Sequence, residues 1–463
     1  MKKFNNIKSI LLVSLILISI FQTGELWFGS LPNRNFFYSF FQKNSYSLIS
    51  DLDEPIHLLM PEKIIINFGV EGGAYSILKN TTKEFEAATE EMTEVLTNIF
   101  LNGENIIEED LNWTKILSKK SILYKYPDII STEGLTARSN ISSKIPKFNQ
   151  IIIVPNKSLT QNMNCYFVDE TDEKVYRVDI SNKVSLYELV NRFNEDIDEI
   201  IYISTKQRQI NQFVNNVFLP TFNKFPTYQN IIMTNPVINN GNMDEVKLEK
   251  IINPLFSNPD LKKKQEAENG IIYYIEGNIM VKYFPEGFIE YTDQSGSGNN
   301  EDNMSFIEAY QVAKSFLDRH ENSLEKEGLL ENFIYLSKQS KTDRGWEFEF
   351  DFKIQDIPYV FSQKIINKIG MKHAVKIIVE NNKVKFYKRL IWEGSLLDEE
   401  QEINIDYIQA LEKIINELHS KGIENIEIDD MYWAYYQKEL NTRAEIYWIV
   451  DIGGTLYPIK ASK

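Results

Sequence analysis

The sequence predicts an α+β fold behind one membrane-spanning segment, and three observations indicate it. Short runs of β-branched and aromatic residues, such as 63–68 and 150–154, have the length and composition of strands. Fewer, longer segments such as 81–99 have the spacing of amphipathic helices. The segment 9–24 carries no charge, and ten of its sixteen residues are Ile, Leu, Val or Phe. We therefore expect a short anchor followed by sheet-rich domains.

The apolar segment at the N-terminus is short for a membrane span. A helix of sixteen residues covers about 24 Å of a hydrocarbon core of about 30 Å. Continuing the helix through Leu26, Trp27 and Phe28 brings it to about twenty residues and places Trp27 at the interface. The three lysines within residues 1–8 then predict a cytoplasmic N-terminus and an extracytoplasmic remainder.

Two other interpretations of this segment stay open. A basic start and an apolar core are also typical of a cleaved signal peptide, although no small-x-small pair precedes the bulky residues 25–28. The segment is also compatible with a buried helix of a cytosolic protein. An uncleaved anchor in the cell membrane is the favoured prediction.

One face of the predicted anchor carries polar side chains. Ser19, Gln22 and Thr23 stand three and four residues apart, so they share a helix face in the outer half of the span. Hydrogen bonds from such residues to another transmembrane helix are worth roughly 0.6–2 kcal/mol. We predict that these residues, with Trp27, bind a partner helix; the alternative is that they only mark the headgroup boundary.

The bulk composition limits the classes of partner. Hydrophobic residues make up 43% and aromatic residues 13% of the 463-residue chain, enough for real cores. Outside the three N-terminal lysines, 47 basic residues face 66 acidic ones, so binding to nucleic acid is not expected. Cys165 is the single cysteine, which excludes an intramolecular disulfide.

Composition and periodicity divide the chain into six parts. A polar, charged stretch separates an N-terminal α+β domain from two C-terminal units. The predicted parts are a cytoplasmic tip with the anchor (1–28), a membrane-proximal segment (29–60), the N-terminal domain (61–256), a linker (257–270) and the two units (271–365 and 366–463).

The N-terminal domain opens with a buried strand over 63–68, followed by a glycine-containing turn and a second strand. A capping box of Thr81 and Glu84 starts an amphipathic helix. Its apolar stripe is Phe85, Ala88, Met92, Val95, Leu96 and Ile99. A later strand runs from Ser121 and stops before Pro127.

The C-terminal half repeats itself at an offset of 100 to 104 residues. The stretch Ile275–Tyr283 returns as Val379–Phe386, each a pair of strands around a Gly-Asn or Asn-Asn turn. Helices opening at Phe306 and Tyr407 follow, and then strands that carry Trp346 and Trp448. We predict two copies of one sheet-and-helix unit lying side by side.

No catalytic, cofactor-binding or metal-binding constellation stands out. The sequence lacks a Walker lysine loop, G-x-S-x-G, H-E-x-x-H and any cysteine cluster. Its four histidines, His57, His320, His373 and His419, lie in separate segments without ligand spacing, which predicts surface or core roles.

Two weaker patterns also favour structural roles. The glycines between 69 and 73 indicate a hairpin rather than a phosphate loop, because they lack a lysine. The acidic residues between 424 and 430 alternate along a predicted strand, which favours a solvated face over a calcium site.

One predicted strand carries aromatic residues on both faces, namely Tyr432, Trp433, Tyr435 and Tyr436. One face should belong to the core. The other is either an extracytoplasmic partner surface or the packing surface between the two repeats.

Several stretches resemble the YycH (WalH) family. The anchor exit Gln22-Thr23-Gly24-Glu25-Leu26-Trp27-Phe28 is similar to that family's Thr-x-x-Leu/Ile-Trp-aromatic exit, although Gly24 and Glu25 depart from it. The segments 61–66 and 124–127 resemble its opening segments. The paired units resemble its C-terminal half, whose modules are similar to PepSY or cystatin folds.

The resemblance implies a non-enzymatic membrane-anchored regulator in Gram-positive cell-wall homeostasis. Its implied partners are the sensor histidine kinase YycG (WalK) and the single-span protein YycI (WalI), contacted chiefly through transmembrane helices. The alternatives are an exported PepSY-like ligand-binding or inhibitor module and, less favoured, a wall-directed hydrolase.

Overall fold

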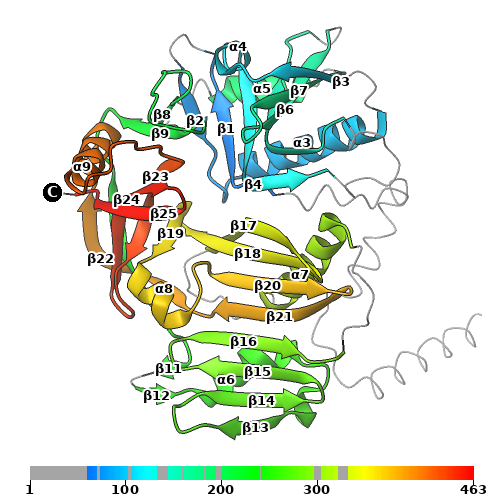
Figure 1. The fold of residues 1–463 in the computed structure, drawn as a ribbon, viewed down its shortest axis with the longest axis vertical. Coiled ribbons are helices and arrows are strands. Elements are labelled where there is room, and N and C mark those ends of the chain that lie inside the picture. The colour runs from blue at the N-terminus through cyan, green and yellow to red at the C-terminus, as the bar shows by residue number, and fades with distance from the viewer. Residues whose placement is uncertain are drawn as a thin grey trace, which may run out of the picture. The chain divides into compact units, whose positions relative to one another are not determined.

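The computed structural model describes residues 60–69, 73–102, 106–132, 144–158, 161–181, 184–193, 200–239, 241–296, 304–321 and 332–462. The chain divides into two compact units, 1–54 and 55–463, and every described residue lies in the second. The predicted anchor and nearly all of the membrane-proximal segment therefore lie outside the described residues. The described part is a sheet-rich α+β structure, which confirms the predicted class (Figure 1).

Among the described residues the first sheet has nine strands, and every neighbouring pair of these is antiparallel (Figure 1). Across the sheet, the strands are β3 (Ile106–Asp110), β7 (Lys174–Ile180), β6 (Met163–Asp169), β5 (Lys147–Val154), β4 (Ser121–Ser131), β1 (Lys63–Asn67), β2 (Tyr75–Ile77), β8 (Ile200–Ser204) and β9 (Phe218–Phe222). The β1–β2 pairing confirms the predicted glycine hairpin.

β1 explains why both faces of this sheet are covered. Ile64 and Ile66 are buried in one core cluster, and Ile65 is buried in a second. Because successive side chains on a strand point to opposite faces, three buried isoleucines in a row need cover on both sides. α3 (Lys83–Asn102) and α5 (Val184–Phe193) cover the first face, and α4 (Trp113–Ile116) covers the second.

α3 is the predicted amphipathic helix, and all six residues of its predicted stripe are buried. Its N-cap is Thr82 and not the predicted Thr81. Thr82 Oγ1 accepts a hydrogen bond from Phe85 N at 3.3 Å. Thr81 instead donates to the Asp356 carboxylate at 3.4 Å. The N-terminus of the helix is thus tied to a distant segment.

β4 does not stop before Pro127, so that prediction is wrong. The strand continues to Ser131, and its register against β5 shifts between Lys125 and Ile130. Proline fits inside a strand at such an irregularity, where no ladder hydrogen bond is needed. The shift leaves Asp128 free to contact another strand.

The second sheet has fourteen strands within the described residues (Figure 1). Its path is β13 (Lys263–Glu266), β14 (Ile272–Glu276), β15 (Ile279–Phe284), β16 (Phe288–Asp293), β21 (Lys383–Leu390), β20 (Val375–Glu380), β18 (Gly345–Ile354), β19 (Ile357–Phe361), β23 (Asp430–Gln437), β24 (Arg443–Ile452), β10 (Thr227–Thr234) and β22 (Glu393–Glu402). β17 (Asn332–Thr342) pairs with β18, and β25 (Thr455–Lys460) pairs with β24.

The predicted repeat appears as an order of elements. β14, β15, β16, α7 (Phe306–Glu321), β17, β18 and β19 come first; β20, β21, β22, α9 (Tyr407–Ser420), β23, β24 and β25 repeat that order. The two copies do not simply lie side by side. The β20–β21 hairpin of the second copy pairs between β16 and β18 of the first (Figure 1). Sheet hydrogen bonding therefore interlocks them.

Two further segments join the second sheet from earlier in the chain. β10 pairs with β22 and β24, and β13, inside the predicted linker, pairs with β14. The remaining elements are β11 (Ile238–Asn239), β12 (Asn242–Met243), α6 (Glu245–Ile252), α8 (Gln363–Ile369) and the 3-10 turns Asn253–Leu255 and Pro259–Leu261. The predicted domain boundaries themselves stay predictions.

Candidate functional site

The predicted transmembrane contact residues, Ser19, Gln22, Thr23 and Trp27, lie outside the described residues. Among the helices of the described part, none has the length and apolar character needed to cross a membrane. The predicted anchor and its partner face therefore stay predictions.

The predicted aromatic surface lies on β23, and two of its four residues are buried. Trp433 stacks on Phe222 with ring centroids 5.2 Å apart, and the Tyr435 hydroxyl donates to the Gln229 carbonyl at 3.0 Å. Tyr432 and Tyr436 point to the other face of the strand and are half-buried. A partner surface on this strand stays a prediction for those two residues only.

Tyr432 lies where the first sheet meets the second, and several hydrogen bonds cross this junction. Asn80 N donates to Asp356 Oδ1 at 2.7 Å, and Gln339 N donates to Asp128 Oδ2 at 2.8 Å. The Lys353 amine also donates to the Glu62 carbonyl. Two cavities lie at this junction. Tyr432 and Pro358 line both of them.

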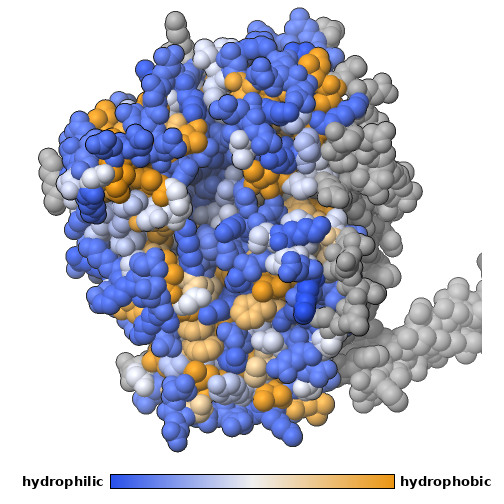
Figure 2. Space-filling view, in the orientation of Figure 1, coloured by the Kyte–Doolittle hydropathy of each residue, from blue (hydrophilic) through white to orange (hydrophobic). Residues whose placement is uncertain are grey.

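The first cavity, of about 640 Å³, is called the acidic cavity below. Figure 2 shows a hollow with mostly hydrophilic side chains at this junction. Its carboxylates are Glu62, Asp128, Glu170, Glu349, Asp351, Asp429, Asp430 and Asp451, and its basic groups are Lys125, Lys338, Lys372 and His373. The predicted solvated face is thus only half right: Glu424 and Glu427 are exposed, but Asp429 and Asp430 line this cavity.

Like charges face one another in part of the acidic cavity. Asp430 on β23 stands directly opposite Asp451 on β24, an unfavourable pair in an antiparallel ladder. Burial raises the pKa of Asp451, and Asp429 and Asp430 raise it further, against the opposing effect of Lys372. Among the described residues, no cluster of three or more His, Cys, Asp or Glu side chains has a geometry that would hold a metal ion.

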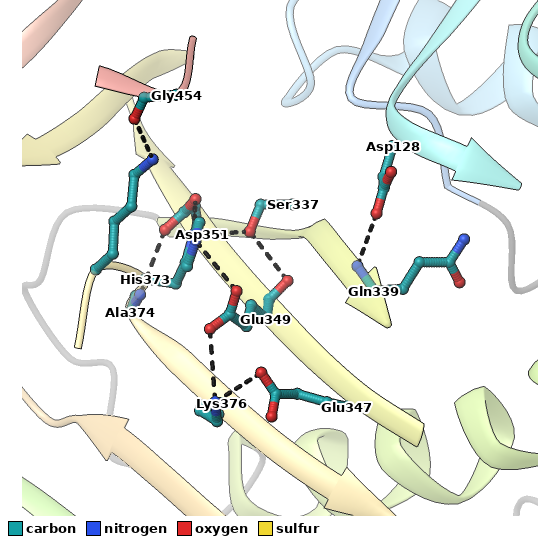
Figure 3. Close-up of polar contacts among 11 residues, drawn as sticks. Asp128, Ser337, Gln339, Glu347, Glu349, Asp351, His373, Ala374, Lys376 and Gly454 are labelled. Carbon is teal, nitrogen blue, oxygen red and sulfur yellow. Dashed lines mark hydrogen bonds and ion pairs between the residues drawn. The ribbon is translucent and has the colours of Figure 1, made fainter. Parts of the chain in front are cut away.

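His373 is the best-connected side chain of the acidic cavity (Figure 3). Its Nδ1 lies 2.8 Å from Asp351 Oδ2, and its Nε2 lies 3.3 Å from Glu349 Oε2. Burial acts to lower the pKa of His373, but the two carboxylates outweigh it and raise the pKa. The His373 ring therefore bridges two carboxylates of β18 from the segment just before β20.

Ser337, His373 and Asp351 do not have the geometry of a hydrolytic triad. A triad places the hydroxyl and the carboxylate on opposite ring nitrogens. Here Ser337 Oγ and Asp351 Oδ2 both contact Nδ1, at 3.1 and 2.8 Å, while Nε2 faces a second carboxylate (Figure 3). The Ser337 hydroxyl donates to the Glu349 carbonyl at 3.0 Å. The cluster is suited to linking strands by charge, not to activating a nucleophile.

The second cavity, of about 720 Å³, is called the aromatic cavity below. Its aromatic lining is Tyr202, Phe218, Tyr228, Tyr432 and Trp433. Its charged lining consists of Lys63, Lys79, Lys353 and Asp356. Two of the four predicted partner-surface residues thus line a cavity at the junction.

A buried ionic group separates the two cavities. Lys63 Nζ lies 3.2 Å from the Glu62 carboxylate and 5.6 Å from the centre of the Tyr432 ring. Burial acts to raise the pKa of Glu62, but its neighbouring lysines outweigh burial and lower it. Burial lowers the pKa of Lys353 to about 8, against the opposing effect of Glu62.

His320 and His419 have core and surface positions, respectively, whereas His373 lines the acidic cavity. His320 is buried, with Nδ1 2.8 Å from the Tyr387 hydroxyl and Nε2 2.8 Å from the Ile251 carbonyl. Its pKa is lowered to about 3, first by burial and then by Arg389. His419 is exposed, and His57 lies outside the described residues.

No local pattern in the sequence predicts either cavity as a whole. Their residues come from segments as distant as Glu62, Asp128, Asp351 and Asp451, and only the folded chain brings them together. The aromatic spacing at 432–436 was a usable signal for the aromatic cavity, but it did not identify the opposing wall.

Comparisons with known proteins give one match to a solved structure. No family model matches the sequence, and no curated protein matches it. The crystal structure of YycH from Bacillus subtilis matches with a TM-score of 0.56, covering 88% of this chain and 97% of that one at 15% identity. The fold is similar to that of YycH. The resemblance predicted from short sequence stretches is thus confirmed, and at this identity the match with YycH shows the fold alone.

Proposed function

We propose that this protein is a membrane-anchored, non-enzymatic regulator of a two-component system. The carrying observation is that its fold is similar to that of YycH over most of both chains. The uncharged segment 9–24 supports the anchored part of the proposal, because it has the composition of a membrane span. In this proposal the N-terminus is cytoplasmic and the two described sheets are extracytoplasmic.

The proposed direct partner is a YycG (WalK)-like sensor histidine kinase, with a YycI (WalI)-like single-span protein in the same complex. Contact runs through the transmembrane helices, and the polar face of Ser19, Gln22 and Thr23 contributes to it. A coupling of only about 1–3 kcal/mol between the anchor and a two-state kinase changes the kinase equilibrium about 5- to 150-fold. Such a role does not require this protein to catalyse a reaction.

The test is co-purification of the kinase with the full-length protein from membranes. The comparison protein carries an unrelated transmembrane helix in place of residues 9–28. We expect recovery of the kinase with the native helix and little with the replacement. Equal recovery with both would place the contact in the extracytoplasmic part, and no recovery with either would contradict the proposed partner.

Point variants of the anchor sharpen this test. Replacing Ser19, Gln22 and Thr23 together by Leu should lower kinase recovery by at least about 3- to 30-fold, which is the loss expected from a single interhelical hydrogen bond worth roughly 0.6–2 kcal/mol. Ser14→Leu is the matched control, because Ser14 lies in the same apolar segment but off that face. If Ser14→Leu lowers recovery equally, the polar face is not the contact.

A further inference from the structure

The aromatic cavity has the size and lining of a small-molecule site. Ligand pockets are typically about 300–1,000 Å³, mostly apolar, with a few converging polar groups. This cavity, of about 720 Å³, is walled by rings from β8, β9, β10 and β23, including Tyr202, Phe218, Tyr228 and Trp433. Flat rings on several sides fit a flat or extended apolar body.

The charges on its wall select the sign of a ligand. Three amines, from Lys63, Lys79 and Lys353, line the cavity against the single carboxylate of Asp356. The Asp356 oxygens already accept hydrogen bonds from Asn80 N at 2.7 Å and from the Thr81 hydroxyl at 3.4 Å. Lys63 is paired with Glu62, whereas Lys79 lines the cavity and is exposed.

The wall of the aromatic cavity also includes a side-chain amide, that of Asn80, whose nitrogen lacks a hydrogen-bond acceptor among the described residues. This nitrogen, Nδ2, is buried. A buried donor left without an acceptor is costly, so such a group usually has a partner. Because Nδ2 has no exposed surface, a bound anion beside Lys79 reaches it only after the Asn80 side chain rotates toward the cavity.

The wall that holds these groups is already shaped. Gln355 and Asp356, in the turn between β18 and β19, have φ values of 51° and 64° although neither is glycine. Two consecutive positive φ values are those of a two-residue type I′ hairpin turn, here between Ile354 and Ile357. Here the contacts of Asp356 with Asn80 and Thr81 fix the turn against the start of α3.

We propose that the aromatic cavity binds a small amphipathic carboxylate, with its apolar body against the rings and its carboxylate beside Lys79 and Asn80. The chain carries a net charge of −16, so its long-range field repels anions. Selectivity must therefore come from the local amines. The inference concerns a ligand and does not depend on the proposed kinase partner.

The test uses the full 463-residue chain in lipid nanodiscs and three probes with the same body. These are naphthalene-2-carboxylate, naphthalen-2-ylmethanol and naphthalen-2-ylmethylammonium, titrated by calorimetry with empty nanodiscs subtracted. We expect the carboxylate to bind saturably and about tenfold more tightly than the ammonium. The lysine amines attract the negative charge of the carboxylate and repel the positive charge of the ammonium. Equal or tighter binding of the ammonium, or no saturable binding of the carboxylate, would overturn the proposal.

Two charge reversals locate the site. Lys79→Glu should weaken binding of the carboxylate about 3- to 10-fold while leaving the alcohol nearly unchanged. Lys263→Glu is the matched control: it changes the net charge equally but lies on edge strand β13, away from the cavity lining. An equal effect of both reversals on the carboxylate would mean that only the long-range field is involved, and the site would be rejected.

Discussion

The acidic cavity and the aromatic cavity share Tyr432 and Pro358, yet their linings have opposite charge. The difference begins with two consecutive residues at the start of the first sheet, since Glu62 lines one cavity and Lys63 the other. Consecutive side chains in an extended chain point to opposite sides. One buried ion pair can therefore give two neighbouring cavities opposite chemistry.

We expect the largest effect from a substitution in the ionic group of Glu62, Lys63 and Lys353, which separates the two cavities. Glu62→Gln leaves the half-buried Lys63 and the buried Lys353 without their main counter-charge. Removing one partner of a buried ionic group typically costs about 3–5 kcal/mol. We expect a loss of that size in the free energy of unfolding, measured by urea denaturation. Glu90→Gln, on the exposed side of α3, is the matched control and should change the free energy by less than about 0.5 kcal/mol.

A loss below about 0.5 kcal/mol for Glu62→Gln would mean that water reaches both lysines and that the two cavities communicate.

On the aromatic side, Lys353 should make stability rise with pH. Its folded-state pKa is about 8 and its ordinary value is 10.5, so between these values the unfolded chain binds the extra proton. The facing charged groups are Glu62, Lys63 and Asp356. Relative to Lys353→Met, the native protein should gain about 2 kcal/mol between pH 7.5 and 9.5, measured by denaturation at both values. A constant difference would show that the amine is solvated.

On the acidic side, His373 should make stability fall with pH. Its folded-state pKa is raised, so the contribution of the imidazolium is complete below the ordinary pKa of about 6.5 and is lost as pH rises through the folded pKa. The facing groups are Ser337 from β17, Glu349 and Asp351 from β18, and the adjacent Lys372.

His373→Gln keeps a hydrogen-bonding side chain but removes this charge. The advantage of the native protein over the variant should be about 1–2 kcal/mol at pH 5.5 and should shrink by pH 9. Parallel stability curves for the two proteins would mean that the carboxylates do not hold the imidazolium. The two pH series together distinguish the cavities, because their slopes have opposite signs.

Local patterns predicted the elements, and distant contacts decided the sites. The apolar stripe from Phe85 to Ile99 and the isoleucines of β1 each follow the periodicity of a single helix or strand. Their burial could therefore be predicted from the sequence. The His373 cluster joins β17 and β18 to the segment before β20, and no spacing within 337–373 distinguishes it from surface charge. The repeat was visible as self-similarity, whereas the pairing of its hairpin depends on which edges are free once other strands have formed.

The hairpin β20–β21 has a consequence for synthesis. β16 and β18 leave the ribosome before residues 375–390 exist, so each carries an unpaired edge for a time. Unpaired strand edges recruit other chains, and long-range pairing is slow to form. The second copy of the repeat therefore completes the first, and a chain ending before residue 375 would present two open edges rather than a finished domain.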